Sequence, residues 1–176
     1  MADINKSNLK NTGIPDVKDA CVVIVRTEWN ASIVDELENG CKRKLSELGV
    51  RKVHVVIVPG AFEIAFAIRD FWKKHKKDKI VPRAFIALAC VLRGDTPHFD
   101  WVCKAVTDGI VELNLKLPVP SIFGVLTVNN EMQALERIGG SQGHKGEEAA
   151  LTAVKMISLL MSKSGKNYPS KRRMAE

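Results

Sequence analysis

The segment Arg93-Gly94-Asp95-Thr96-Pro97-His98 combines residue types that could bind an anion and move a proton. Gly94 lets the backbone approach a ligand closely. Thr96 adds a hydroxyl, and the free N–H groups at the start of a following helix are a natural anion site. His98 has a side chain that titrates near neutral pH, which suits proton transfer. The same pattern also fits an ordinary capped helix with a surface histidine, and the residue types leave both interpretations open.

Four further residues carry chemistry, each with a structural alternative. Trp29 could stack on a planar ligand or pack on the next helix. Glu63 could accept hydrogen bonds from a polyol or complement a helix dipole. Arg137 could simply neutralise the end of a short helix. Lys145 precedes the last helix, where a cation opposes the dipole, and this favours a role other than structure.

Motifs of other enzyme classes are missing from the sequence. It contains no Walker loop, no G-x-G-x-x-G and no G-x-S-x-G. Nucleotide-dependent and serine-hydrolase chemistry are therefore poorly supported.

The elements that must position these residues alternate between two types. Continuous apolar runs typical of fully buried strands occur at 21–25, 53–58, 84–92 and 121–127. Helical patterns follow them at about 32–48, 61–74, 96–116, 130–137 and 146–161. Such alternation predicts a three-layer α/β/α sandwich around a mostly parallel four-stranded sheet. Ligands of such sheets bind at the carboxyl ends of the strands.

Local signals set the expected helix starts. Ser32 with Asp35 resembles a capping box. Thr96 is the expected N-cap of its helix, with Pro97 at the first helical position. Residues 139–143 are expected to form a loop.

The length and composition describe one globular domain. The chain has 176 residues, of which 45% are hydrophobic and 27% charged. We expect an N-terminal arm over 1–19, an α/β domain over 20–162 and a basic tail over 163–176. The longest apolar run, 84–92, is far below the ~18–20 residues that span a bilayer, so we expect no membrane partner.

The net charge of +7 is concentrated in two segments. Residues 73–79 and 163–176 each carry +4, which leaves −1 for the rest of the chain. Nucleic-acid binders spread their cations over a face and add stacking aromatics, and neither feature is present. We therefore expect two solvated charge runs and no nucleic-acid partner.

The cysteines and histidines do not show the spacing of a metal or disulfide framework. The polar N-terminus also lacks the apolar core of a secretory signal. We expect free thiols, a cytoplasmic location, no structural metal and no cofactor.

Six segments together resemble the 6,7-dimethyl-8-ribityllumazine synthase family, in its order and at its spacing, over about 21–160. The matching segments are Trp29-Asn30, Val58-Pro59-Gly60-Ala61-Phe62-Glu63-Ile64, Cys90-Val91-Leu92-Arg93-Gly94-Asp95-Thr96-Pro97-His98-Phe99, Pro120-Ser121-Ile122-Phe123-Gly124-Val125-Leu126-Thr127, Gln133-Ala134-Leu135-Glu136-Arg137 and Lys145-Gly146-Glu147.

The resemblance implies a flavodoxin-like α/β fold and a transferase of riboflavin biosynthesis. Such an enzyme condenses 5-amino-6-(D-ribitylamino)uracil with 3,4-dihydroxy-2-butanone 4-phosphate by imine formation, phosphate elimination and ring closure. By position, His98 would transfer protons. Phosphate would be held by Asp95, Thr96 and Arg137. The pyrimidine and its ribityl chain would contact Trp29, Asn30, Ala61, Phe62, Glu63, Cys90, Val91, Leu92, Phe123 and Lys145.

The resemblance also implies an assembly. The family's site lies between adjacent subunits of a homopentamer, so Phe123 and Lys145 would come from the neighbour. The short 139–146 connection favours the icosahedral capsid of sixty subunits, and the N-terminal arm is expected to add a strand to a neighbouring subunit.

Some residues depart from the family pattern. Glu28 stands where arginine or a small residue is usual, and Ala65 replaces a proline. Asp95 is acidic beside the expected phosphate, which requires a backbone N–H to make that contact.

Two alternatives use the same scaffold. One is a non-catalytic flavin-binding or shell-forming protein, for which Trp29 would suit stacking. The other is an archaeal-type riboflavin synthase, against which Arg137 and Lys145 argue, since that reaction handles no phosphate.

Overall fold

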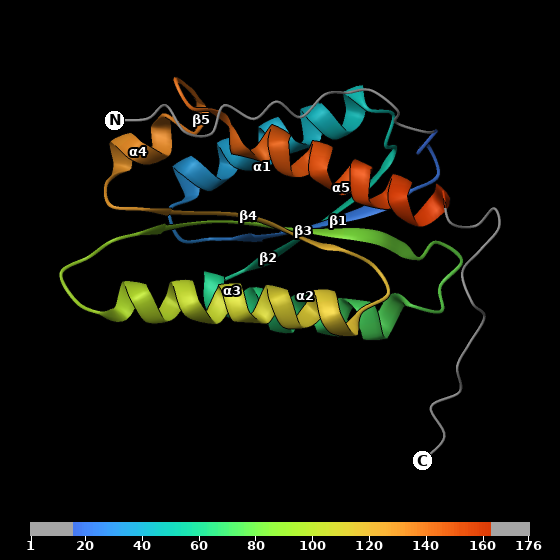
Figure 1. Cartoon of the computed structure of the whole chain (residues 1–176), viewed down its shortest axis with the longest axis horizontal. Coiled ribbons are helices and arrows are strands. Elements are labelled where there is room, and N and C mark those ends of the chain that lie inside the picture. The colour runs from blue at the N-terminus through green and yellow to red at the C-terminus, as the bar shows by residue number, and fades with distance from the viewer. Residues whose placement is uncertain (1–15, 163–176) are drawn as a thin grey trace, which may run out of the picture.

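A computed structural model of the chain describes residues 16–162 as alternating strands and helices (Figure 1). The strands are β1 (Cys21–Thr27), β2 (Lys52–Val58), β3 (Pro82–Leu92), β4 (Ser121–Val128), β5 (Ile138–Gly140) and β6 (Gly143–His144). The helices are α1 (Ala31–Glu47), the short 3-10 helix η1 (Ala61–Glu63), α2 (Ile64–His75), α3 (His98–Lys116), α4 (Glu131–Leu135) and α5 (Lys145–Ser162).

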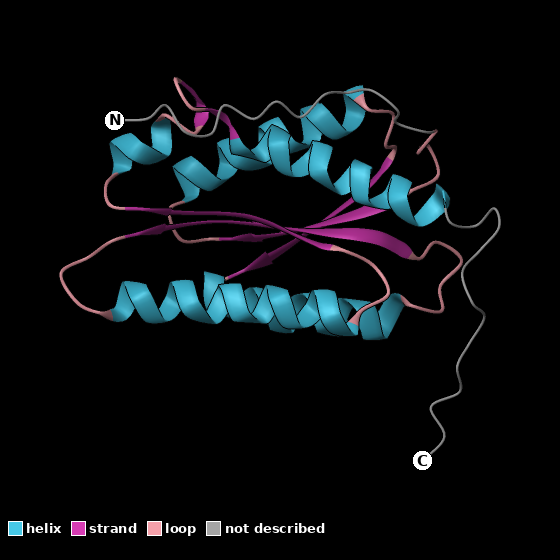
Figure 2. Ribbon diagram, viewed as in Figure 1, coloured by secondary structure: helices cyan, strands magenta, loops and turns pink. Residues whose placement is uncertain are grey.

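The central sheet confirms the predicted architecture. Its four strands have the order β2-β1-β3-β4, and every pairing is parallel. Helices α1 and α5 cover one face and α2 and α3 the other, which gives three layers (Figure 2). This strand order is that of the flavodoxin-like sheets, which bind ligands at the carboxyl ends of their strands.

The inner strands, β1 and β3, are mostly apolar because both of their faces are covered. In β1, Val22 and Ile24 pack in the core beneath α1 and α5, whereas Val23 and Val25 pack in the core beneath α2 and α3. A strand buried on both faces needs apolar residues at successive positions. This explains why an unbroken β-branched run predicted β1.

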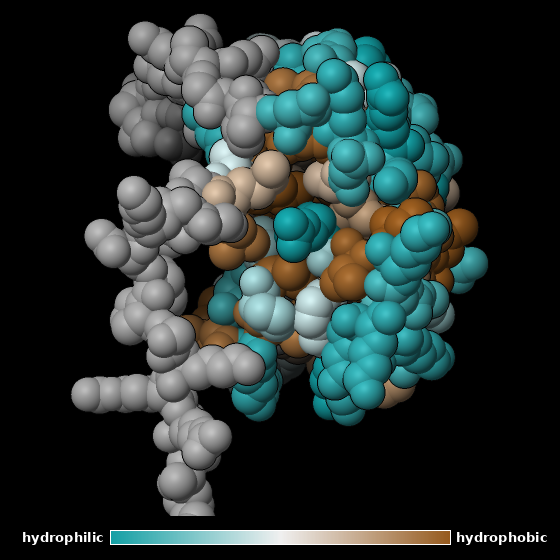
Figure 3. Space-filling view, turned by 90° about the vertical axis from the view of Figure 1, so that its right-hand side faces the viewer, coloured by the Kyte–Doolittle hydropathy of each residue, from teal (hydrophilic) through white to brown (hydrophobic). Residues whose placement is uncertain are grey.

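The carboxyl ends of the strands meet at one end of the molecule. There β3 leads into α3, and β4 leads into α4 (Figure 1). The lysine-rich turn between α2 and β3 lies at the other end. Figure 3 shows that end, where hydrophilic side chains surround hydrophobic patches.

The predicted capping box at Ser32 is wrong. Helix α1 begins at Ala31, after Asn30, which adopts the left-handed conformation and makes no side-chain cap. The Asp35 carboxylate instead accepts a hydrogen bond from the Arg26 guanidinium. The helix therefore starts earlier than expected, because the turn at Asn30 already directs the chain into it.

Two other local predictions are wrong. Helix α3 begins at His98, and its N-cap is Pro97 with no side-chain hydrogen bond, so Thr96 is not the cap. The expected loop at 139–143 belongs to an antiparallel hairpin, in which Ile138 pairs with His144 and Gly140 with Gly143. Short glycine-rich strands of this kind have no alternation of apolar residues by which to recognise them.

The expected N-terminal arm and basic tail lie largely or wholly outside the described residues. Within residues 16–162, no helix is both long and apolar enough to cross a membrane. The same residues include no group of three or more histidine, cysteine or acidic side chains arranged to hold a metal ion.

Candidate functional site

Trp29 lies on a loop whose backbone is held by hydrogen bonds, whereas the Trp29 side chain is exposed. The Glu28 amide donates to the Val58 carbonyl (2.9 Å), and the Trp29 amide donates to the Pro59 carbonyl (3.3 Å). The Trp29 side chain nevertheless remains 72% exposed. It therefore does not pack on the next helix, and it presents an aromatic face on an anchored turn.

Asn30 is engaged within the protein. Its φ of 57° lies in the left-handed region, where asparagine is tolerated better than most residues. Its Nδ2 donates to the carbonyl oxygen of Cys90 at 2.8 Å, which ties the loop after β1 to the end of β3. One predicted ligand-binding residue thus has a role in positioning Trp29.

The turn after β2 presents Phe62 beside this loop. Ala61 is buried, while Phe62 is 65% exposed. A Glu63 carboxylate oxygen, Oε2, accepts a hydrogen bond from the Gly60 amide (3.0 Å). That contact agrees with the structural alternative given for Glu63, a role at the start of its helix, and it uses one of the two carboxylate oxygens.

The end of β3 is less accessible than its neighbours. Cys90 is buried, and burial raises the pKa of its thiol to about 11. The thiol is therefore neutral at physiological pH and is no nucleophile. Val91 and Leu92 are half-buried.

Arg93 joins two loops at this end of the sheet. Its Nε donates to the Asn129 side-chain oxygen (3.1 Å), and its Nη2 donates to the Asp100 carboxylate (2.9 Å). Its guanidinium also lies 4.1 Å from the centre of the Phe99 ring. Sequence reasoning gave Arg93 no role; the signal was an arginine at a strand end with an aspartate in the first turn of the next helix.

Asp95, Thr96 and His98 are all exposed around the start of α3. Because α3 has 19 residues, its first N–H groups and its dipole create an anion-binding end. Asp100 would weaken that field, but its charge is paired with Arg93. Phosphate binding by this segment stays a prediction.

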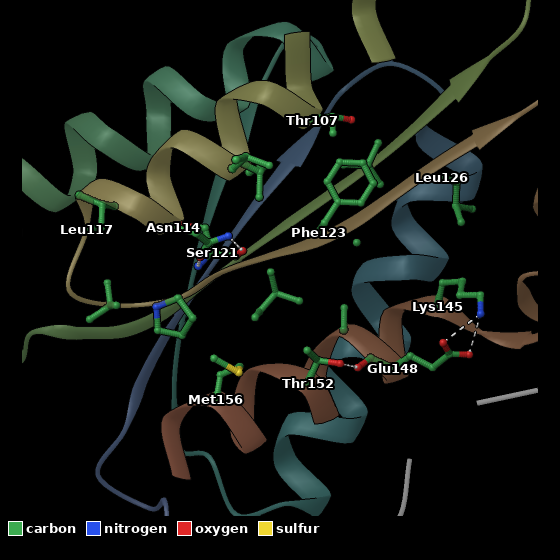
Figure 4. Close-up of a pocket in the computed structure, with 18 of the residues that line it drawn as sticks. Thr107, Asn114, Leu117, Ser121, Phe123, Leu126, Lys145, Glu148, Thr152 and Met156 are labelled. Carbon is green, nitrogen blue, oxygen red and sulfur yellow. Dashed lines mark hydrogen bonds and ion pairs between the residues drawn. The ribbon is translucent and has the colours of Figure 1, made fainter. Parts of the chain in front are cut away.

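A groove of about 960 Å³ runs along β4, between α3 and α5 (Figure 4). Phe123 points into it from β4 and is 42% exposed. Arg137 and Lys145 also line it. Among residues 16–162, β4 pairs with β3 alone, so its other edge faces this groove.

The two cations of the groove are held by the β5–β6 hairpin. The Lys145 amide donates to the Arg137 carbonyl (2.8 Å). The Lys145 ammonium is paired with Glu148 (2.9 Å). Arg137 donates from Nη1 to the Gln133 carbonyl (2.8 Å), so it also caps α4, as its structural alternative predicted.

The predicted site residues thus divide into two groups. The strand-end group contains Trp29, Asn30, Ala61, Phe62, Glu63, Cys90, Val91, Leu92, Asp95, Thr96 and His98. The groove group contains Phe123, Arg137 and Lys145. None of the strand-end residues is among those that line the groove.

Comparison with known proteins identifies the family. The family model described as 6,7-dimethyl-8-ribityllumazine synthase matches residues 19–161. The protein of that name from Parabacteroides distasonis is 42% identical over 156 residues, covering 88% of this chain and 94% of its own. Its namesake from Porphyromonas gingivalis is 44% identical over 157 residues, with the same two shares. The chain therefore belongs to the 6,7-dimethyl-8-ribityllumazine synthase family.

Proposed function

We infer that this protein is a 6,7-dimethyl-8-ribityllumazine synthase, an enzyme of riboflavin biosynthesis. It would condense 5-amino-6-(D-ribitylamino)uracil with 3,4-dihydroxy-2-butanone 4-phosphate. The observation that carries the proposal is the match to the family over residues 19–161. An exposed aromatic and the open N-terminus of α3, at one end of the sheet, are consistent with it.

The reaction needs reactants held together and protons moved. The Trp29 ring would stack on the pyrimidine, with Phe62 and Glu63 along the ribityl chain. The second oxygen of the Glu63 carboxylate would accept from a substrate hydroxyl while Oε2 keeps its bond to Gly60. Holding two reactants in a productive orientation can supply ~7–11 kcal/mol of a bimolecular barrier.

Phosphate would bind at the start of α3. The Thr96 hydroxyl and the free backbone N–H groups there would hold it, with the Asp95 carboxylate turned toward water. His98 would move protons during imine formation and phosphate elimination. A positioned general acid–base residue typically contributes ~10²–10⁴-fold.

The groove group would complete the site from a second copy of the chain. Phe123, Arg137 and Lys145 share the groove on β4, apart from the strand ends. An apolar groove beside an unpaired strand edge is a surface that proteins cover. In a homopentamer, this groove would receive the neighbour's strand-end group, and Arg137 would reach phosphate together with Phe123 and Lys145.

Two finer assignments rest on the resemblance, and a third rests on the cysteines. The short 139–146 connection favours assembly of pentamers into a sixty-subunit capsid. The N-terminal arm would pair with a neighbouring sheet. The four cysteines are free, three of them buried and one partly buried, which suits a cytoplasmic enzyme.

The activity is tested by mixing the protein with both substrates and following lumazine fluorescence and released phosphate. We expect His98→Ala to lower kcat by about 10²-fold or more. We expect Arg137→Ala to raise the KM for the phosphate substrate by about tenfold or more, the loss of a charged hydrogen bond. His54→Ala, an exposed histidine on β2, is the matched control. No acceleration over the uncatalysed condensation, with tight riboflavin binding, would favour the flavin-binding alternative.

Subunit mixing tests the shared site. If each site combines two halves from adjacent chains, an equal mixture of His98→Ala and Arg137→Ala chains has about a quarter of its sites intact. With both substrates well below their KM, coassembly should therefore raise the activity to about a quarter of that of the unmutated protein, whereas Trp29→Ala with His98→Ala should give no more than the average of the two separate variants. Failure of the first mixture to recover would mean that His98 and Arg137 act from the same subunit.

A further inference from the structure

His144 is the buried polar side chain of the β5–β6 hairpin, and it lies outside the groove lining. Its side chain is 8% exposed. Its Nδ1 has no hydrogen-bond partner among the described residues, and its Nε2 lies 3.5 Å from a Glu36 carboxylate oxygen. Burying an unpaired polar atom destabilises the folded state. Packing must therefore hold the ring in place.

Two glycines make room for this ring. A Cβ on Gly40 of α1 would overlap the imidazole, and its three nearest atoms would all belong to His144, the third at 2.7 Å. A Cβ on Gly146 would overlap the Leu37 carbonyl oxygen and lie 3.1 Å from the His144 ring. The hairpin can therefore rest on α1 only while both positions lack side chains.

The hairpin connects the His144 ring, packed against α1, to the two cations of the groove. His144 pairs with Ile138, the residue after Arg137. It directly precedes Lys145, whose amide donates to the Arg137 carbonyl at 2.8 Å. Fixing the His144 ring against α1 therefore fixes the backbone at both Arg137 and Lys145.

We propose that His144, seated against Gly40, is a positioning residue that holds Arg137 and Lys145 in the geometry used for the phosphate substrate. This inference rests on the proposed function. It assigns the ring no contact with substrate. The His144 ring is held mainly by the shape of its surroundings. Its contact with Glu36 is weak, because the two side chains are 3.5 Å apart and Glu36 is 41% exposed.

The test is a cycle of Gly40→Ala, His144→Ala and the double variant in the full chain. Gly40→Ala alone should displace the ring. It should speed exchange of the Lys145 amide hydrogen and raise the KM for the phosphate substrate, each by about tenfold, with kcat changed by less than about threefold. With His144→Ala already present, Gly40→Ala should add nothing, because the clash is gone and alanine favours a helix.

Two controls sharpen the cycle. Asn39→Ala changes the exposed neighbour of Gly40 and should leave both readouts unchanged. Glu36→Gln should change them by less than about twofold if shape dominates. Full additivity of Gly40→Ala and His144→Ala, or faster exchange without a change in KM, would overturn the proposal. A protein inactive in the condensation would refute the proposed function, while the exchange data would still decide whether His144 holds the hairpin.

Discussion

Substitutions of Asn30 can show whether this residue holds its loop in place or contacts the ligand. Its side chain donates to the Cys90 carbonyl at 2.8 Å, and its backbone has a φ of 57°. Asn30→Ala removes the hydrogen bond, worth about 0.5–1.5 kcal/mol. It also puts alanine in the left-handed region, at about 1–2 kcal/mol. We expect the free energy of unfolding to fall by about 2–3 kcal/mol.

Two companion variants divide that loss. Asn30→Gly loses the hydrogen bond but accepts the left-handed backbone, so it should be more stable than Asn30→Ala by about 1 kcal/mol. Asn30→Asp keeps the shape and the backbone tolerance but cannot donate, and it brings a carboxylate toward the Cys90 carbonyl. Its loss should therefore be at least that of the hydrogen bond, about 0.5–1.5 kcal/mol.

The assay is denaturant unfolding of each variant at one fixed protomer concentration, because assembly alters apparent stability. In a parallel thermal unfolding experiment, the midpoints of the Asn30→Gly and Asn30→Ala variants should differ by about 2–4 °C. The KM for the pyrimidine substrate should rise as the Trp29 loop loosens. If the alanine and glycine variants were equally stable, and Asn30→Asp left the free energy of unfolding unchanged, the structural role of Asn30 would be refuted. Asn30 would then act through ligand contact alone.

Three further predictions follow from the same end of the sheet and from the buried thiols. Trp29→Ala should leave the free energy of unfolding within about 0.5 kcal/mol, because the ring is exposed, yet raise the KM for the pyrimidine substrate by about tenfold in steady-state assays; a stability loss as large as that of Asn30→Ala would contradict this. Arg93→Gln should lower the free energy of unfolding by about 1–2 kcal/mol, because it removes two hydrogen bonds of the charged guanidinium and the Phe99 contact, and it should raise the KM for the phosphate substrate. Lys42→Gln, on the exposed side of α1, is the control, and an unchanged KM would exclude a role of Arg93 in positioning the start of α3. Burial raises the pKa of the Cys41 thiol to about 12, so between pH 9 and 12 the folded protein keeps a proton that the unfolded thiol, with a pKa near 9, loses. The contribution of Cys41 to the free energy of unfolding should therefore be constant below pH 9 and fall from there toward pH 12, so denaturant unfolding across that range should show a less steep fall in Cys41→Ala.

The strands could be predicted because burial on both faces leaves a strong signal. The run 21–25 is continuous and β-branched, and β1 lies in the middle of the sheet. Alternation with helices then fixed the layers and the carboxyl-end rule. Prediction succeeded where one physical requirement, such as burial on both faces, applies to many residues of the same segment.

Helix starts depend on single residues, and prediction failed there. Ser32 and Asp35 have the types and spacing of a capping box, yet Asn30 turns the chain into α1 first. Asparagine is common both at caps and in left-handed turns, so its type does not decide between them. The Cys90 carbonyl decides, and it lies on a strand 60 residues away.

The site shows the same limit at a larger scale. The carboxyl-end rule directs attention to the loops that follow the strands, where Trp29 lies and after which α3 begins at His98. Phe123 does not lie in such a loop. It is the third residue of β4, where it pairs with Ala87 of β3, well before the carboxyl end of the strand. Only the family resemblance predicted it as a site residue, and its side chain points into an open groove from β4, the edge strand of the described sheet. The order of strands, and therefore which strand is the edge, is absent from local patterns. Because one chain displays the strand-end group and the groove group on separate surfaces, the proposed site would be completed only by a second copy of the chain.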